Sequence, residues 1–93
     1  MNALGFIEIP NATDALEVLD VMLKTSAVSF KTCEKKFGGR LVTIIVEGEL
    51  AAVKAAIEAA KNAPGKIAAS AVIGRPHDET VKMVELSARK YNQ

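Results

Sequence analysis

The chain is poor in the side chains that most reactive sites use, with one cysteine, Cys33, and one histidine, His77, in 93 residues. A single cysteine excludes an internal disulfide and any CxxC metal or redox motif. Neither the phosphate-binding pattern GxxxxGKS/T nor the dinucleotide pattern GxGxxG occurs in it. Cys33 and His77 are a weak nucleophile and base, because no residue is evident that would orient the pair. We therefore expect no catalytic residue, no metal ligand and no cofactor.

Aromatic residues are also scarce, since the chain has three phenylalanines, one tyrosine and no tryptophan. Hydrophobic residues make up 49% of the chain, but many are alanine, so each buried side chain contributes little area. A chain of this length forms one domain, residues 1–93, and buries only about 60–65% of the surface that its unfolded form exposes. So thin a core favours a protein that uses apolar surface to bind copies of itself.

Positive and negative side chains are nearly balanced. The chain has 12 Lys and Arg residues and 11 Asp and Glu residues, which give a formal net charge of +1. Nucleic-acid and membrane-surface binders usually carry a clear basic excess, so we expect neither partner. The sequence starts with neither a basic leader nor a long apolar run, and no segment approaches the roughly 20 apolar residues that span a bilayer. These absences indicate a cytoplasmic protein whose partners are proteins or small molecules.

The first third of the chain predicts a strand and a helix. Strand-forming residues 3–9 end at Pro10, which cannot donate to a sheet, and Asn11 or Thr13 can cap the helix that follows. Val18 and Val21 fall outside the helix's main apolar stripe, so they either flank the core or contact a neighbouring subunit. The predicted core stripe has a spacing of three and four residues and consists of Ala12, Ala15, Leu16, Leu19, Met22 and Leu23.

Two further strands flank a basic glycine turn. Residues 28–33 alternate as in a half-exposed strand, whereas residues 41–46 are continuously apolar and are expected to be buried on both faces. Gly38-Gly39 between them is typical of a hairpin connection. With Lys35, Lys36 and Arg40 this turn could cradle a phosphate, but a hairpin is the wrong context for a P-loop.

The second half predicts a helix, a strand and a terminal helix. The helix that follows Glu49 buries Leu50, Val53, Ile57 and Ala60, and its other faces are rich in alanine, so that it can pack on two sides. Residues 66–74 form a strand, and residues 78–93 have the pattern of a short, partly exposed helix. The order β-α-β-β-α-β plus a helix predicts an α+β, ferredoxin-like fold with an antiparallel sheet and helices packed against it.

Taken in order and at this spacing, several segments resemble the single-domain shell proteins of bacterial microcompartments. These proteins are the hexameric tiles that enclose ethanolamine-utilisation, propanediol-utilisation and carboxysome enzymes. The resemblance covers residues 4–79. Its most specific segments are Leu4-Gly5-Phe6-Ile7-Glu8, Asp20-Val21-Met22-Leu23-Lys24, Leu41-Val42-Thr43-Ile44-Ile45-Val46-Glu47-Gly48-Glu49 with the alanine-rich helix after it, and Arg75-Pro76-His77.

The resemblance implies a structural protein, not an enzyme, that forms a flat homohexamer and tiles edge to edge with neighbouring hexamers and other shell proteins. Lys24 corresponds to the edge lysine that lies against its counterpart in the adjacent hexamer. Arg75 corresponds to the arginine that inserts across that edge, with His77 beside it. The loop between the second and third strands would line a central pore for small metabolites. Its pore-lining candidates are Phe37, Gly38, Gly39 and Arg40.

The chain departs from the family pattern at three places. The pore loop looks one residue longer than usual, Ala27 stands where many members carry a polar residue, and residues 81–93 do not match a common ending and could cover one face. An oligomeric regulatory module of ACT or PII type is the main alternative, because it is also built from ferredoxin-like units. An acylphosphatase-type enzyme is a weaker alternative, because the glycine turn is a poor match to the phosphate-binding loop that such an enzyme requires.

Overall fold

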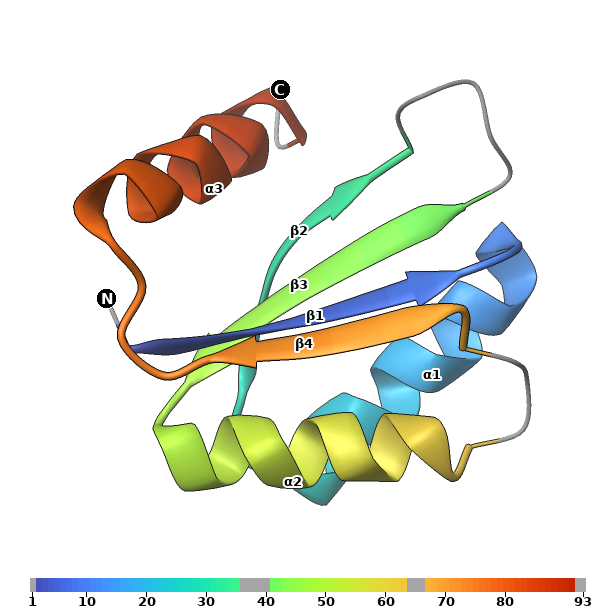
Figure 1. The fold of residues 1–93 in the computed structure, drawn as a ribbon. Coiled ribbons are helices and arrows are strands. Elements are labelled where there is room, and N and C mark those ends of the chain that lie inside the picture. The colour runs from blue at the N-terminus through green and yellow to red at the C-terminus, as the bar shows by residue number, and fades with distance from the viewer. Residues whose placement is uncertain (1, 36–40, 64–66, 92–93) are drawn as a thin grey trace.

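The computed structural model describes residues 2–35, 41–63 and 67–91. Its four strands form one antiparallel sheet in the order β2-β3-β1-β4, the arrangement predicted for a ferredoxin-like α+β fold (Figure 1). The elements in chain order are β1 (Ala3–Ile9), α1 (Ala12–Thr25), β2 (Ser29–Glu34), β3 (Val42–Gly48), α2 (Leu50–Lys61), β4 (Ala69–Ile73) and α3 (Asp78–Tyr91).

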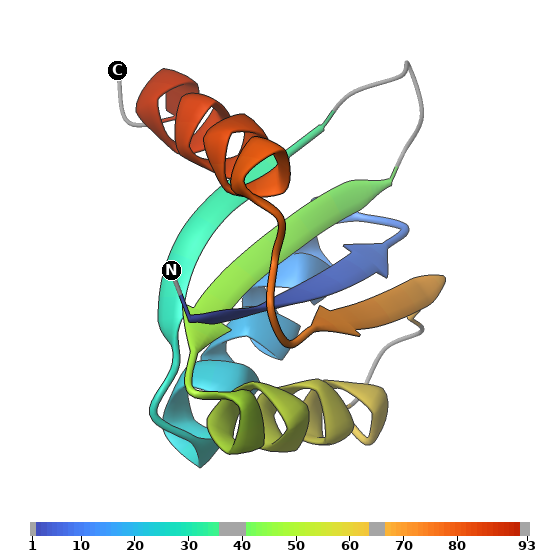
Figure 2. The same cartoon turned by 60° about the vertical axis from the view of Figure 1, so that its left-hand side comes forward.

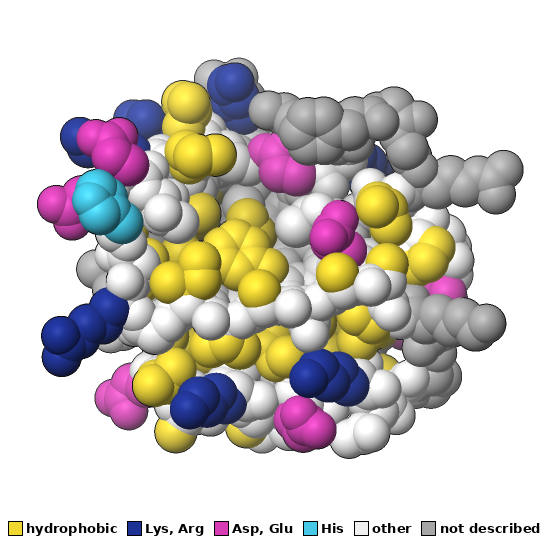
Figure 3. Space-filling model, in the orientation of Figure 1, with side chains coloured by type: hydrophobic (Ala, Val, Ile, Leu, Met, Phe, Trp, Pro, Cys, Tyr) yellow, Lys and Arg dark blue, Asp and Glu magenta, His cyan; other side chains and the backbone are white. Residues whose placement is uncertain are grey.

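The sheet is covered unequally on its two faces. Helices α1 and α2 pack side by side on one face, and α3 lies on the other, over β2 (Figures 1 and 2). The main core lies between the sheet and α1 and α2, while a small second cluster joins Leu4 and Ile45 to Val84 of α3. Hydrophobic side chains gather in the hollow between α3 and strands β1 and β4 (Figure 3). The terminal helix therefore covers only part of one sheet face.

Helix α1 begins where the sequence predicted and buries part of the predicted stripe. Asn11 caps it, because its side-chain oxygen accepts a hydrogen bond from the Asp14 backbone N–H at 2.8 Å. Val18 is 1% exposed and packs in the core, whereas Leu16 is 70% exposed and Leu23 also faces outward. The predicted stripe is therefore wrong in part. Two adjacent apolar rows share the same spacing, and the sheet covers the row Ala15, Val18 and Met22.

Strand β2 contains an irregularity that the predicted alternation missed. Its register against β3 shifts between Phe30 and Thr32, so Lys31 is an extra residue. As a result Phe30 and Cys33 both pack against the main core, while Thr32 is fully buried and hydrogen bonds to α3. The Lys31 ammonium lies 3.4 Å from the Glu47 carboxylate on β3, which pairs the displaced charge.

Strand β3 is buried on both faces, as predicted. Ile44 belongs to the core beneath α1 and α2, and Ile45 belongs to the cluster beneath α3. Leu41 precedes the strand and is exposed, so the strand begins one residue later than predicted.

Helix α2 approaches β1 closely because β1 has a glycine at the crossing point. A Cβ atom on Gly5 would lie 2.9 Å from Val53 Cγ1 and 3.1 Å from Ile57 Cδ1. Leu50, predicted to line the buried face, is instead exposed at the first turn. The buried row consists of Val53, Ala56, Ile57 and Ala60.

Strand β4 is shorter than the predicted residues 66–74. Within the described part of the chain it pairs with β1 alone, which leaves its other edge free there. Its first three residues are exposed. Among the helices of the described residues, none has both the length and the apolar character needed to cross a bilayer.

Candidate functional site

The sheet register separates the candidate residues into two groups at opposite ends of the sheet. We call the end where β2 finishes at Glu34 and β3 begins at Val42 the loop end, because the β2–β3 connection leaves from it. At the opposite end, β1 begins, β3 ends at Gly48 and β4 ends at Ile73. We call this the Arg75 end, because Arg75 follows β4 after one residue, Gly74.

Lys24 belongs to the Arg75 end. It lies in the last turn of α1, and the next residues hold that turn against α2, since the Ser26 hydroxyl donates to the Ala52 carbonyl at 2.7 Å. The Lys24 ammonium lies 2.7 Å from the Asp20 carboxylate one turn earlier, and both side chains are exposed. The hydrogen bond that Lys24 donates to the Asp20 carboxylate, and the negative charge of Asp20, raise the pKa of Lys24. Lys24 is thus an exposed cation whose position is set by its own helix.

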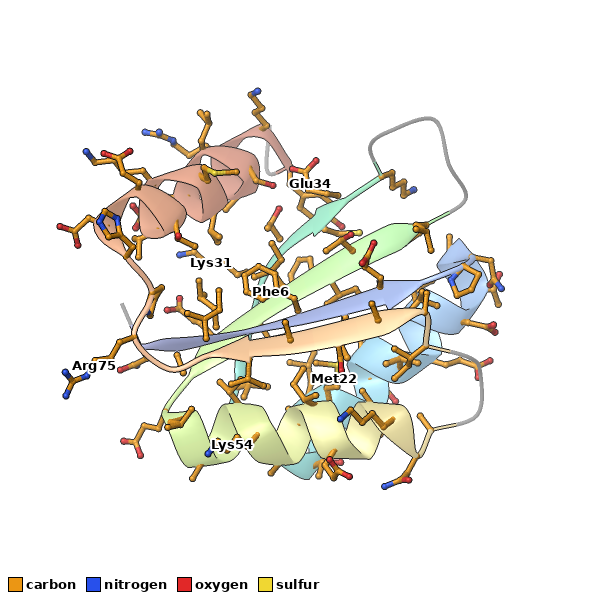
Figure 4. All side chains as sticks on the ribbon, viewed as in Figure 1. Phe6, Met22, Lys31, Glu34, Lys54 and Arg75 are labelled. Carbon is orange, nitrogen blue, oxygen red and sulfur yellow. The ribbon has the colours of Figure 1, made fainter. Side chains whose placement is uncertain are left out.

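Arg75 and His77 occupy the turn between β4 and α3. Arg75 is exposed and extends away from the body of the molecule (Figure 4). His77 precedes α3 and caps it: its Nδ1 accepts from the Glu79 backbone N–H at 3.0 Å, and its carbonyl accepts from the Val81 N–H at 3.0 Å. His77 therefore has a structural role that the sequence did not reveal, while its side chain stays exposed.

The predicted pore residues Phe37, Gly38, Gly39 and Arg40 lie outside the described residues. The described residues on either side of them are Lys35 and Leu41, and both are exposed. Strand β2 finishes and strand β3 begins at the loop end, so the connection leaves the sheet there.

A polar cluster at the loop end was missed by sequence reasoning. The Ser87 hydroxyl of α3 donates a hydrogen bond to the Glu34 carboxylate, and Thr32 Oγ1 lies 3.0 Å from Ser87 Oγ. Beside it, the Tyr91 ring packs edge-on against Phe30 with centroids 5.5 Å apart. No sequence signal pointed to this cluster, because it needs both the shifted register of β2 and the docking of α3.

An apolar groove of about 150 Å³ lies along the β2 side of the molecule. Leu16 and Leu19 of α1 line it together with Phe30, Cys33 and Tyr91. Burial raises the pKa of the Cys33 thiol, and the nearby Lys35 ammonium partly offsets the rise. Because burial disfavours the thiolate, the Cys33 position suits packing better than nucleophilic chemistry.

The described residues offer no reactive constellation. Cys33 lies near the loop end and His77 at the Arg75 end, so the weak nucleophile–base pair considered from the sequence is not formed. Within residues 2–35, 41–63 and 67–91, no group of three or more His, Cys, Asp or Glu side chains is placed to hold a metal ion. What the surface offers is an apolar side and an end that carries exposed cations.

A family model described as the BMC domain matches residues 3–76. The chain belongs to the BMC-domain family. This membership confirms the resemblance to microcompartment shell proteins and favours it over the regulatory-module alternative. The relatives are shell proteins by name, which agrees with the structural, non-enzymatic role predicted from the sequence.

The relatives include bacterial microcompartment shell proteins and carboxysome shell proteins. The chain is 41% identical over 85 residues to the bacterial microcompartment shell protein PduA of Citrobacter freundii, covering 88% of this chain and 90% of PduA. It is 39% identical over 87 residues to the shell protein EutK of Escherichia coli (strain K12), covering 90% of this chain and 52% of EutK. It is 36% identical over 89 residues to the carboxysome shell protein CsoS1C of Hydrogenovibrio crunogenus, covering 90% and 85%.

A solved structure supports the same fold. A microcompartment protein from Desulfitobacterium hafniense DCB superimposes with a TM-score of 0.79 at 20% sequence identity. The match covers 94% of this chain and 48% of that chain. At this identity it shows the fold of this BMC-domain chain and nothing further.

Proposed function

We propose that this BMC-domain chain forms a cyclic homohexamer that tiles into a microcompartment shell and passes small metabolites through a central pore. The observation that carries the proposal is the separation of Lys24, Arg75 and His77 from the β2–β3 connection, at opposite ends of one sheet. In a ring of wedge-shaped subunits, one end of each subunit faces the axis and the other faces the rim. The loop end then faces the pore, and the Arg75 end faces the next hexamer.

A ring of identical subunits needs two different surfaces that fit each other, because head-to-tail contacts are heterologous. One side of this molecule presents β2, α1 and the apolar groove with Leu16 at its margin. The opposite side presents the free edge of β4, where Ala69, Ser70 and Ala71 are exposed and small. Small residues allow a neighbour to approach closely, so the second side can fill the groove of the first. This pairing would use the apolar surface that the thin core leaves over.

The edge contact would involve Lys24, Arg75 and His77. Lys24 forms an ion pair with Asp20 one turn earlier on α1, and this pair limits the positions that the Lys24 ammonium can take. Arg75 projects outward and can reach across to a carbonyl or carboxylate of the adjacent hexamer. These cations offer the same contact to neighbouring hexamers and to other shell proteins of the same size.

The pore part of the proposal rests on the sequence. One Arg40 from each subunit would place six cations around a narrow opening, which favours anions and raises their local concentration. Gly38 and Gly39 would add backbone N–H groups and leave room for passage. Phe37 either narrows the opening or packs against the sheet.

A solution-mass measurement tests the ring. Leu16→Gln places a polar amide in the proposed subunit contact and should shift the hexamer to smaller species at micromolar concentration. Burying a leucine side chain contributes about 1.5–3 kcal/mol, and six contacts close each ring. Met83→Gln is the matched control, because Met83 is an equally exposed apolar residue on α3. A wild-type chain that is monomeric at all concentrations would refute the proposal.

A further inference from the structure

The cluster of Thr32, Ser87 and Glu34 forms a directed chain of hydrogen bonds. A serine hydroxyl has one hydrogen to donate, and Ser87 donates it to the Glu34 carboxylate. The contact of 3.0 Å between Thr32 Oγ1 and Ser87 Oγ must then run from the Thr32 hydroxyl to Ser87. Donors arranged head to tail polarise one another, which strengthens the final bond to the carboxylate. The cluster thus holds a carboxylate in a defined position.

The Glu34 carboxylate is held by a hydroxyl group of α3 in a half-buried place. Thr32 is 0% exposed, and both Ser87 and Glu34 are half-buried. The acids that form ion pairs within residues 2–35, 41–63 and 67–91 are Asp20, Glu47, Glu58 and Glu79, and Glu34 is not among them. Among the described residues, the Ser87 hydroxyl holds the Glu34 carboxylate, and no ion pair does.

Glu34 lies at the loop end of the sheet, where its carboxylate can act on the proposed pore. Glu34 is the last residue of β2 and pairs with Thr43 at the loop end of the sheet. Its carboxylate is directed toward α3, on the sheet face that α1 and α2 do not cover (Figure 4). In the proposed hexamer, which this inference requires, the loop end faces the pore. Six copies of this carboxylate would then surround the pore mouth at a distance that Ser87 controls.

We propose that Ser87 is a positioning residue that draws the Glu34 carboxylate toward α3 and so withholds six negative charges from the pore mouth. Helix α3 therefore sets the charge selectivity of the pore for small ions and metabolites. With Ser87 in place, the opening prefers anions. Without it, the carboxylate is free to turn toward the opening and lowers that preference.

The experiment measures the chloride-to-potassium permeability ratio of sheets of the full-length chain under a potassium chloride gradient. Salt near 10 mM keeps the screening length at about 30 Å, so that the charge of Glu34 is felt across the opening. We expect Ser87→Ala to lower the ratio about threefold or more. We expect Ser87→Thr, which keeps a hydroxyl, to stay near the wild-type value. Thr80→Val removes a hydroxyl from the first turn of α3 and is the matched control.

A double variant separates positioning from simple fastening of α3. If the freed Glu34 charge causes the change, Ser87→Ala combined with Glu34→Gln should return the ratio to that of Glu34→Gln alone. If Ser87 only fastens the helix, Ser87→Ala would speed hydrogen exchange in α3 and leave the permeability ratio unchanged. That result, or a double variant as impaired as Ser87→Ala, would overturn the inference while leaving the hexamer intact. Absence of wild-type hexamers would instead refute the proposed function.

Discussion

His77 Nδ1 accepts a hydrogen bond from the backbone N–H of Glu79 at 3.0 Å, which makes the chain's one histidine the cap of α3. An uncapped helix leaves its first N–H groups without partners. The same residue lies beside Arg75 at the end of the sheet proposed to meet the next hexamer. His77 thus connects the docking of α3 with the turn that would carry the hexamer edge.

His77→Ala should destabilise α3, because loss of a capping side chain typically costs about 0.5–2 kcal/mol. The measurement is hydrogen exchange of the α3 backbone, which should become faster in the first turn. His77→Asn is the matched control, since asparagine is a good cap but lacks the imidazole. Equal protection in the alanine and asparagine variants would contradict the capping role. If the imidazole itself contributes to the hexamer edge, His77→Ala and His77→Asn should impair sheet formation equally, because both lack it.

Gly5→Ala should destabilise the fold, because the new methyl group would lie 2.9 Å from Val53 Cγ1, where β1 and α2 touch. Overpacking of this kind typically costs about 1–3 kcal/mol. Urea unfolding at one fixed protein concentration measures the change. Gly74→Ala is the control, since its nearest neighbour would be Leu50 Cδ1 at 3.5 Å, an ordinary contact. A Gly5→Ala variant as stable as wild type would show that α2 can move away without cost.

Cys33 should react slowly with iodoacetamide in the folded protein, because burial raises the pKa of its thiol and the thiolate is the reactive form. Mass spectrometry at pH 8 should show slower alkylation of the folded chain than of the urea-unfolded chain. The rate should continue to rise at pH values where an ordinary thiol is already ionised. Because the unfolded thiol ionises first, this group's contribution to stability falls as the pH rises above the unfolded pKa. Equal rates in the folded and unfolded chains would contradict burial of Cys33.

Lys24→Ala should abolish extended sheets and leave hexamers intact, because Lys24 is exposed and lies at the Arg75 end. Electron microscopy scores the sheets and solution mass scores the hexamers. Lys54→Ala removes another exposed lysine, on α2, and serves as the control (Figure 4). An ordinary lysine is already charged at moderately alkaline pH, and Asp20 raises the pKa of Lys24 further, so wild-type sheets should persist there. Sheets formed by Lys24→Ala would remove Lys24 from the edge.

The fold could be predicted largely from the sequence, because its local signals agree with one another. Pro10 marks the end of β1 and Asn11 the start of α1. The continuous apolar run of β3 predicted burial on both faces, which Ile44 and Ile45 confirm. The order of the elements was sufficient to predict the antiparallel sheet.

The faces of α1 could not be assigned in the same way. Leu16 and Val18 belong to apolar rows of equal spacing, and only the position of the sheet decides which row is covered. A pattern read from one chain also treats every apolar row as core. If the hexamer forms as proposed, Leu16 lies in a contact between chains. An apolar residue at helical spacing then marks a subunit contact and not the core of one chain.

The cluster at the loop end could not be predicted from the sequence, for a different reason. Thr32, Glu34 and Ser87 are unremarkable polar residues, and Ser87 is separated from Thr32 by 55 positions. They meet because the irregularity at Lys31 turns Thr32 toward α3 and because α3 folds back over β2. Nothing local to either segment encodes that meeting.

Electron microscopy of the purified wild-type chain, with its solution mass measured on the same sample, tests whether the chain forms hexameric tiles. We expect six-fold rings with a central opening and the mass of six chains, joined into sheets or tubes. Discrete dimers or trimers that never assemble would contradict it. Such a result would show that this chain does not form the proposed hexameric tile.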